Sequence, residues 1–229
     1  MTGSDRGAPL PTPAGPAAGS LLGILGGTFD PPHIAHLAIA EEAREVLGLT
    51  RVLFVPAGQP WQKAARAVTP GGVRLAMVER AIAGNAAFAV DGREIERPGP
   101  SYTVETLAAL VAGGAGRDPW FVLSSEALAG FATWREPERI LGLARLCVVP
   151  RGPEPTAAVS AFLARFPGAA GRLAVLDGPR LDISSTEIRA RVRAGRSIRY
   201  LVPDGVAALI REYALYVADP VPDPAPAEA

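Results

Sequence analysis

Apolar residues along the chain fall into two alternating patterns. Short continuous apolar runs, such as residues 52–55 and 120–123, are typical of strands buried on both faces of a parallel sheet. Runs of this kind predict strands at 21–26, 51–55, 86–90, 119–124, 145–149 and 172–176. Longer segments with apolar positions at helical spacing predict helices at about 35–47, 71–83, 102–112, 136–143, 156–166, 185–194 and 204–216.

The alternation of strands and helices predicts the fold class. It is typical of an α/β fold: a Rossmann-like, doubly wound, mainly parallel sheet of about six strands with helices on both faces. Ligands of such sheets bind beyond the carboxyl ends of the strands, at the point where the strand order reverses. No Gly-x-Gly-x-x-Gly follows the first predicted strand. A hydride-transfer enzyme built on that dinucleotide fingerprint therefore loses support.

The two ends of the chain differ in composition from the middle. Residues 1–20 are rich in Pro, Ala, Gly and Thr and contain no apolar run, so we expect a disordered tail rather than a signal peptide. Residues 218–229 form a proline-rich segment that we also expect to be disordered. One folded domain then spans residues 21–217. No segment has the run of apolar residues needed to span a membrane.

Charge and cysteine content narrow the function classes. Lys and Arg number 23, Asp and Glu number 23, and the formal net charge is zero. This balance argues against a nucleic-acid binder or a membrane-surface binder, whose affinity rests on a basic excess. Cys147 is the only cysteine, which excludes an intrachain disulfide framework. We therefore expect a cytoplasmic protein; homo-oligomer formation is left open.

A first candidate site follows the first predicted strand. His33 and His36 are the only histidines, and they come just after Gly26-Gly27-Thr28-Phe29-Asp30-Pro31-Pro32. A strand, a glycine-rich loop and a helix in this order place backbone N–H groups at a helix N-terminus, where an anion is favoured. Two imidazoles three residues apart on the first turn share one face of that helix. The pattern predicts a phosphate site.

Other interpretations of this segment remain open at this point. A Gly-Gly pair after a strand is usually only a turn, and each histidine could be a helix-surface residue. His-x-x-His could also be half of a metal site, but a closed site needs about four ligands. With no third histidine and one cysteine, such a site would have to use carboxylates. We predict no protein-held metal.

A second candidate site lies near the C-terminus, in Ile183-Ser184-Ser185-Thr186-Glu187-Ile188-Arg189. Ser184 or Ser185 is a good N-cap, and Glu187, three residues after Ser184, completes a capping-box pattern. The segment could be no more than a well-capped helix. However, three hydroxyls at the positive end of a helix dipole, with Arg189 one turn later, also suit a phosphate. Arg191 and Arg193 are expected to face solvent.

Taken together, these two segments resemble the signatures of the nucleotidyltransferase superfamily. Within it, the chain is most similar to bacterial nicotinate-nucleotide adenylyltransferases over residues 21–217. The further matching pieces are residues 55–63, 100–107, 133–134 and 200–206. The resemblance implies transfer of an adenylyl group from ATP to nicotinate mononucleotide, giving deamido-NAD and pyrophosphate in NAD biosynthesis, with Mg²⁺ required. It implies no protein nucleophile.

The resemblance also implies roles for individual residues. His33, His36 and Arg189 would be catalytic, with His36 nearest the reacting α-phosphate. ATP would be bound by both motifs and by the segment after the fourth predicted strand: Gly26, Gly27, Thr28, Phe29, His33, His36, Ser124, Glu126, Ile183, Ser184, Ser185, Thr186 and Arg189.

For the acceptor, the family stacks the pyridine ring on a tryptophan, which is Trp134 here. Its carboxylate would be bound by backbone N–H groups near Thr103 and Arg135. The nicotinate-nucleotide site implied by the resemblance comprises Lys63, Tyr102, Thr103, Trp134, Arg135 and Arg151. Trp134 could instead be a core aromatic residue, and Lys63 or Arg151 a plain loop residue.

The chain departs from the family pattern at two places, and the second affects the expected substrates. Ala35 replaces the glycine that usually precedes the second histidine, which is a small change. Leu123-Ser124-Ser125-Glu126 stands where the family has Gly-x-Asp, whose glycine and aspartate contact the ribose of adenosine. The alternatives are therefore a related nucleotidyltransferase with another nucleotide or acceptor, such as phosphopantetheine or a specialised metabolite, and a non-catalytic nucleotide-binding regulator.

Overall fold

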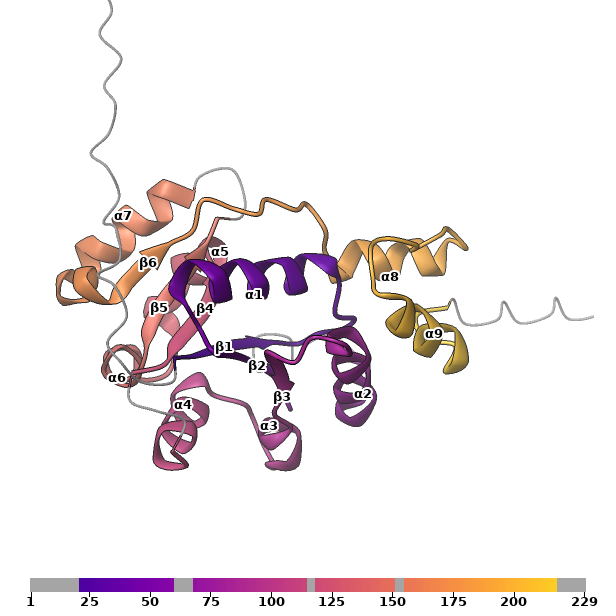
Figure 1. Ribbon diagram of the computed structural model, residues 1–229, viewed down its shortest axis with the longest axis horizontal. Helices are drawn as coiled ribbons and strands as arrows, with labels where there is room; N and C mark the ends of the chain where they lie inside the picture. The colour runs from indigo at the N-terminus through magenta and orange to yellow at the C-terminus, as the bar shows by residue number, and fades with distance from the viewer. Residues whose placement is uncertain (1–20, 60–67, 115–117, 151–154, 218–229) are drawn as a thin grey trace, which may run out of the picture.

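A parallel sheet forms the centre of the molecule (Figure 1). The computed structural model describes residues 21–59, 68–114, 118–150 and 155–217; the predicted tails, 1–20 and 218–229, lie outside these ranges. The strands are β1 (Leu22–Gly27), β2 (Arg51–Pro56), β3 (Phe88–Val90), β4 (Trp120–Ser124), β5 (Arg145–Val149) and β6 (Leu173–Val175). Every strand predicted from the apolar runs is confirmed.

Helices connect the strands and complete the C-terminal end. They are α1 (Ile34–Leu47), α2 (Gly71–Ile82), α3 (Arg93–Glu96), α4 (Thr103–Ala112), α5 (Ser125–Ala129), α6 (Pro137–Leu143), α7 (Pro155–Arg165), α8 (Ser185–Arg193) and α9 (Asp204–Glu212), with 3₁₀ turns at η2 (Phe131–Thr133) and η3 (Pro167–Arg172). The predicted helices are all present. The short elements α3, α5, η2 and η3 were not predicted, because one turn is too short to show a helical period.

The last helix ends earlier than predicted. We expected it to continue to residue 216, but α9 ends at Glu212. Ala214 and Tyr216 have positive φ angles of 46° and 61°, in the left-handed region that a continuous right-handed helix excludes. The segment after α9 therefore turns back toward the body of the molecule, where the hydroxyl of Tyr216 meets Asp30.

The strand order explains where a ligand can enter. The order is β3-β2-β1-β4-β5-β6, and each neighbouring pair is parallel. From β1 the chain proceeds to one edge of the sheet, and from β4 it proceeds to the other. The order therefore reverses between β1 and β4, and their following connections diverge. Gly27 at the end of β1 and Ser124 at the end of β4 stand at this switch point.

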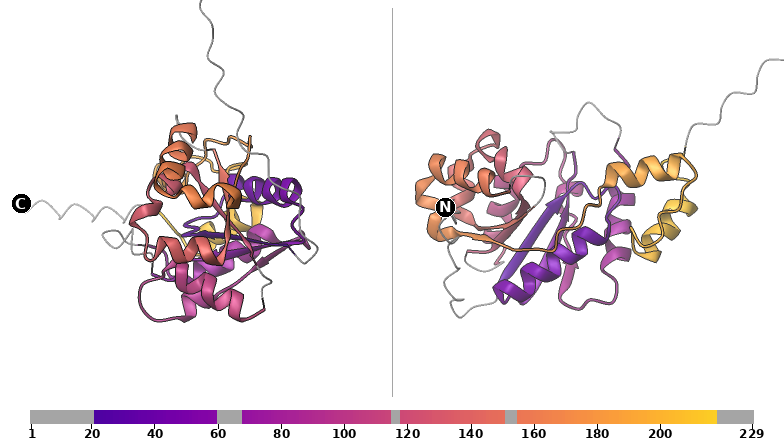
Figure 2. Two further views of the ribbon diagram at one scale, coloured as in Figure 1. Left: turned by 90° about the vertical axis from the view of Figure 1, so that its left-hand side faces the viewer. Right: turned by 90° about the horizontal axis from the view of Figure 1, so that it is seen from above.

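Two hydrophobic cores cover the two faces of the sheet. Successive strand residues alternate between them: Ile24 belongs to the first core and Leu25 to the second. The first core includes side chains of α4, α5, α6 and α7, and the second includes side chains of α1 and α2. Figure 1 shows α1 on one side of the sheet and α4 on the other, and the view from above in Figure 2 shows α1 lying along the strands.

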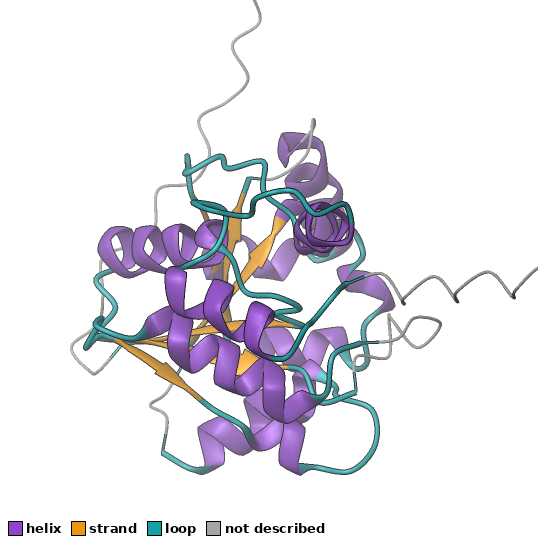
Figure 3. Ribbon diagram, turned by 90° about the vertical axis from the view of Figure 1, so that its right-hand side faces the viewer, coloured by secondary structure: helices purple, strands orange, loops and turns teal. Residues whose placement is uncertain are grey.

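A third core joins the C-terminal helices to α2. Met77 of α2 packs with Ile188 of α8 and with Val206 and Ile210 of α9, and all four are buried. Figure 3 views the molecule from this end. Since α2 also contributes Val78 to the second core, one helix links the sheet to the C-terminal pair. In the part of the chain that is described, no helix has both the length and the apolar character needed to cross a bilayer.

Candidate active site at the switch point

The loop between β1 and α1 has a tightly constrained backbone. Phe29 has a positive φ of 50°, and the residue is 2% exposed. A Cβ added to Gly27 would meet that ring at 3.0 Å, so glycine permits the close approach. The Phe29 ring also meets the His36 ring edge-on, with ring centroids 5.0 Å apart. Phe29 therefore supports the histidine from within the core, while Gly27 and Thr28 line the cavity described below.

The two histidines stack on each other at the start of α1. Their ring centroids are 3.7 Å apart, and the rings are inclined by 31°. The expectation that both lie on the first turn was wrong for His33, which is the N-cap residue preceding the helix. The backbone N–H of His33 donates to Nδ1 of His36 at 3.1 Å. With Nδ1 accepting, a neutral His36 ring carries its proton on Nε2, where it can be donated to a ligand.

Helix α8 docks directly on this loop. The hydroxyl of Ser185 donates to the carbonyl of Pro31 at 2.8 Å, and Nη1 of Arg189 donates to the carbonyl of Asp30 at 2.7 Å. Of the two serines that the sequence offered as N-cap, Ser184 is the N-cap of α8, and its hydroxyl accepts from the N–H of Glu187 at 3.1 Å. Two motifs about 150 residues apart thus meet at one place.

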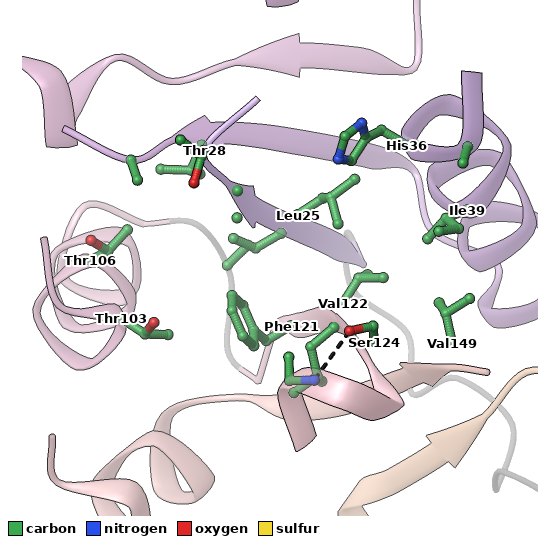
Figure 4. Close-up of a pocket in the computed structure, with 18 of the residues that line it drawn as sticks. Leu25, Thr28, His36, Ile39, Thr103, Thr106, Phe121, Val122, Ser124 and Val149 are labelled. Atoms are coloured by element: carbon green, nitrogen blue, oxygen red, sulfur yellow. Dashed lines mark hydrogen bonds between the residues drawn. The ribbon is translucent and has the colours of Figure 1, made fainter. Parts of the chain in front are cut away.

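A cavity of about 380 Å³ opens at the carboxyl ends of β1 and β4. Figure 4 shows Thr103 and Thr106 entering it from α4, and His36 and Ile39 from α1 on the opposite side. Strand residues, among them Leu25, Phe121 and Val122, lie between the two helices. The predicted residues that line the cavity are Gly26, Gly27, Thr28, His33, His36, Thr103, Ser124, Trp134 and Ile183.

Aromatic packing holds Trp134 at the edge of the cavity. Its ring contacts Phe131 and Phe121, with centroid distances of 5.3 Å and 6.0 Å, and it is half-buried. Arg135 does not line the cavity. Its guanidinium lies 4.7 Å from the centre of the Tyr102 ring, and Nη1 pairs with Glu105 Oε1 at 3.0 Å. Tyr102 and Arg135 therefore flank the cavity, and Thr103 and Trp134 line it.

The departure at Ser124 has a local structural cause. Ser124 ends β4 and is the N-cap of α5, where its hydroxyl accepts from the N–H of Ala127 at 3.1 Å (Figure 4). The serine supplies the cap of a helix that a glycine could not cap through a side chain. Glu126, one residue into α5, is exposed. Lys63 and Arg151 lie outside the described residues.

Glu94 of α3 is a cavity residue that the sequence analysis missed. Its carboxylate is buried and accepts from the hydroxyl of Thr106 at 2.5 Å. Burial raises the pKa of the Glu94 carboxyl above its ordinary value, and hydrogen bonds with Thr106 and Ser101 oppose that rise. Ser101 also accepts from the N–H of Gly58 at 3.0 Å, which ties the loop after β2 to this group.

Arg74 of α2 is a second missed residue. Its side chain is 1% exposed and donates to three carbonyls, those of Thr69, Thr28 and Gly58, at 2.8, 2.8 and 3.0 Å. Burial lowers its pKa, yet a guanidinium remains charged at physiological pH. A signal existed in the sequence, since Arg74 shares helical spacing with the buried residues Met77, Val78 and Ala81.

The described residues offer no ready-made metal site. No group of three or more His, Cys, Asp or Glu side chains within them is arranged to hold a metal ion. Cys147 is buried in β5, and burial raises the pKa of its thiol to about 12, which leaves it unreactive at neutral pH. The polar side chains that line the cavity are therefore imidazoles, hydroxyls and the Glu94 carboxyl, and α8 docks beside it on the loop of the histidines.

Comparisons with known proteins identify relatives of the chain. The cytidylyltransferase-like family matches residues 24–191. A Roseiflexus sp. protein named "probable nicotinate-nucleotide adenylyltransferase" is 50% identical over 197 residues, covering 85% of this chain and 97% of that protein. A Herpetosiphon aurantiacus protein of the same name is 44% identical over 197 residues, covering 86% and 98%.

Solved structures show the same fold. The nicotinic acid mononucleotide adenylyltransferase of Plasmodium falciparum, complexed with NaAD, superposes with a TM-score of 0.69 at 19% identity, covering 86% of this chain and 98% of that one. The same protein complexed with APC gives a TM-score of 0.68. At this level of identity the likeness supports the Rossmann-like architecture and no more.

Glu94→Gln tests the ionisation of the buried carboxyl. The variant keeps an oxygen that can accept from Thr106. Because the pKa of Glu94 is raised in the folded state, the contribution of this carboxyl to stability is fully present below pH 4.5, its pKa in the unfolded chain. That contribution is lost as the pH rises through the folded-state pKa. The free energy of unfolding of Glu94→Gln should therefore increase relative to wild type from pH 4.5 to neutrality, as measured by urea denaturation.

The matched control is Glu79→Gln, at an exposed position of α2. Its free energy of unfolding should stay within about 0.5 kcal/mol of wild type over this range, as is usual for surface substitutions. A pH-independent difference for Glu94→Gln would contradict the raised pKa.

Proposed function

The chain belongs to the nicotinate-nucleotide adenylyltransferase family, and we propose that it transfers the adenylyl group of ATP to nicotinate mononucleotide, forming deamido-NAD and pyrophosphate. The observation that carries the proposal is the meeting of the two motifs beside one cavity. The stacked His33 and His36 and the N-terminus of α8 come together at the reversal point of the sheet.

The reaction requires no covalent intermediate with the protein. An oxygen of the nicotinate mononucleotide 5′-phosphate forms a bond to the α-phosphorus of ATP. The bond from that phosphorus to the oxygen bridging to the β-phosphate breaks, and pyrophosphate leaves with the electron pair. The protein then contributes positioning and charge stabilisation, as is general for transfers at phosphorus.

The nucleotide half of the site supplies donors and positive charge. In our proposal His36 donates from Nε2 to the α-phosphate, and His33 contacts the same phosphate chain. Ser185, Thr186 and Arg189 bind the adenylyl and triphosphate groups at the N-terminus of α8, where the helix dipole favours an anion. Gly26, Gly27 and Thr28 let the two nucleotides approach the backbone closely.

The acceptor half of the proposed site is built around Trp134 and the start of α4. We assign the pyridine ring to the face of Trp134, where stacking contributes about 1 kcal/mol beyond area burial. The backbone N–H groups near Thr103 and Arg135 bind the carboxylate of the ring, and Tyr102 flanks this end of the pocket. Lys63 and Arg151, outside the described residues, complete the assignment taken from the family.

Magnesium is proposed as part of the ATP substrate. The described residues hold no cluster of carboxylates or imidazoles for a resident ion, and Mg²⁺ commonly binds through substrate phosphates. The charge of the triphosphate is then shared between its own cation and the donors of the protein. We place the reaction in the cytoplasm, a proposal supported by the single cysteine.

A substrate panel tests the proposed function. Purified protein is incubated with MgATP and, separately, nicotinate mononucleotide, nicotinamide mononucleotide or phosphopantetheine, and pyrophosphate release is measured. We expect release with nicotinate mononucleotide to exceed the other two by at least about tenfold, because the ring carboxylate is read by hydrogen bonds. Replacing ATP by CTP or GTP measures the effect of Ser124 and Glu126 on nucleotide choice.

The panel also separates the alternatives. Preferred release with phosphopantetheine or with another nucleotide would identify a different nucleotidyltransferase. Binding of ATP without pyrophosphate release from any acceptor would identify a nucleotide-binding regulator.

A pair of substitutions at His36 distinguishes the roles of its two ring nitrogens. The amide oxygen of His36→Asn can replace Nδ1 as acceptor from His33, but the variant has no donor near Nε2. The longer His36→Gln places its amide nitrogen near the Nε2 position. We expect kcat to fall roughly a hundredfold or more in His36→Asn, the effect of one lost anion-stabilising donor, and less in His36→Gln.

Steady-state kinetics with nicotinate mononucleotide measures this difference. Glu45→Gln, an exposed substitution on the same helix, is the control and should leave kcat unchanged. If kcat of His36→Asn equalled that of wild type, His36 would have no catalytic role.

A further inference from the structure

A tyrosine beyond the last helix reaches back to the loop that carries the histidines. The hydroxyl of Tyr216 donates to the Oδ1 of Asp30 at 2.7 Å, across 186 residues of sequence. The same hydroxyl accepts from Thr69 Oγ1 at 3.4 Å. Asp30 is 2% exposed, so this bond is formed inside the protein. Burial raises the pKa of Tyr216, which keeps its hydroxyl protonated as a donor at physiological pH.

Arg74 extends this group to the other side of the loop. It donates to the carbonyl of Thr69, next to the Tyr216 hydroxyl, and to the carbonyl of Thr28, two residues before Asp30. Its third bond, to Gly58, fixes the loop after β2. Asp30, Thr69, Arg74 and Tyr216 therefore form one buried network, which we call the loop network.

The loop network adds to the bonds made by α8. The carbonyls of Thr28, Asp30 and Pro31 accept from Arg74, Arg189 and Ser185, respectively. The backbone N–H of Ile34 donates to the carbonyl of Leu201, immediately after His33. The segment that ends in the stacked histidines is thus held by α2, by α8 and by the chain beyond α9.

We propose that the loop network, through the Tyr216 hydroxyl, positions His33 and His36 for transfer of the adenylyl group. This inference rests on the proposed function. The Tyr216 hydroxyl bonds to Asp30 and Thr69, and neither residue lines the cavity. Tyr216 is therefore a positioning residue that acts through Asp30 and the backbone of the loop. Small misplacements of donors at a reacting phosphorus reduce rate steeply, and a network that fixes the loop backbone limits such displacement.

The hydroxyl is separable from the packing of the C-terminal segment. Val206, Leu209 and Ile210 anchor α9 in the third core, and Leu215 packs against it. Tyr216→Phe keeps the ring and removes only the two hydrogen bonds. The packing of α9 should therefore survive, while Asp30 loses its donor from this segment.

Tyr216→Phe is the direct test, with Tyr213→Phe as its matched control. Tyr213 is 53% exposed and lies three residues earlier. Assayed well below the melting temperature, Tyr216→Phe should lower kcat by roughly tenfold to a hundredfold with KM for nicotinate mononucleotide unchanged, as expected for misplaced catalytic groups. Tyr213→Phe should match wild type in both constants.

Two further readouts complete the experiment. In an Asp30→Ala background, Tyr216→Phe should cause no additional loss of kcat, because the hydroxyl acts through Asp30. Amide hydrogen exchange of residues 28–36, measured without substrate, should be faster in Tyr216→Phe than in wild type. If Asp30→Ala does not fold, the inference is decided by kcat of the two single variants, Tyr216→Phe and Tyr213→Phe, and by the hydrogen exchange of residues 28–36.

Hydrogen exchange also separates this inference from the proposed function. An inactive wild-type protein would refute the function, and the loop network would then be judged on exchange alone. Unchanged kcat in Tyr216→Phe with an active wild type, or unchanged exchange of the loop with an inactive one, would overturn the inference. A fall in kcat matched by Tyr213→Phe would overturn it as well.

Discussion

The structure depends on how the backbone carbonyls of the loop from Thr28 to His33 obtain hydrogen-bond donors. A buried carbonyl without a donor costs free energy, and this loop cannot use the regular ladder of a helix or strand. Its carbonyls accept instead from Arg74 on α2 and from Ser185 and Arg189 on α8. Because α2 and α8 meet in the third core, the packing of that core and the geometry of the candidate site are coupled.

Much of the fold could be predicted from the sequence. Continuous apolar runs are sufficient for strands buried on both faces, and the order of the elements indicates a doubly wound sheet. The one-turn helices α3 and α5 could not be predicted, since they have no period to detect. Nor could the end of α9, where left-handed residues turn the chain so that Tyr216 reaches Asp30.

The candidate site was predicted in outline and missed in detail. The spacing of the glycine-histidine motif and the serine-capped helix predicted two halves of one anion site. The bonds to Asp30 and Pro31 bring the two motifs into contact, and their joint binding of an anion stays a prediction. The N-cap position of His33 and the capping bond of Ser124 depend on local backbone angles that composition does not determine. The buried Glu94 gave no sequence signal, because its polar neighbours resemble a loop. Arg74 did give one, as a charged residue on an apolar helix face.

A crystal structure with a non-hydrolysable ATP analogue and nicotinate mononucleotide would show whether the two motifs hold one triphosphate between them. We expect the triphosphate to lie between His36 and the N-terminus of α8, with Nε2 of His36 within hydrogen-bond distance of the α-phosphate. The pyridine ring should lie on Trp134. Phosphates bound away from either motif, or an α-phosphate out of reach of both imidazoles, would contradict this expectation.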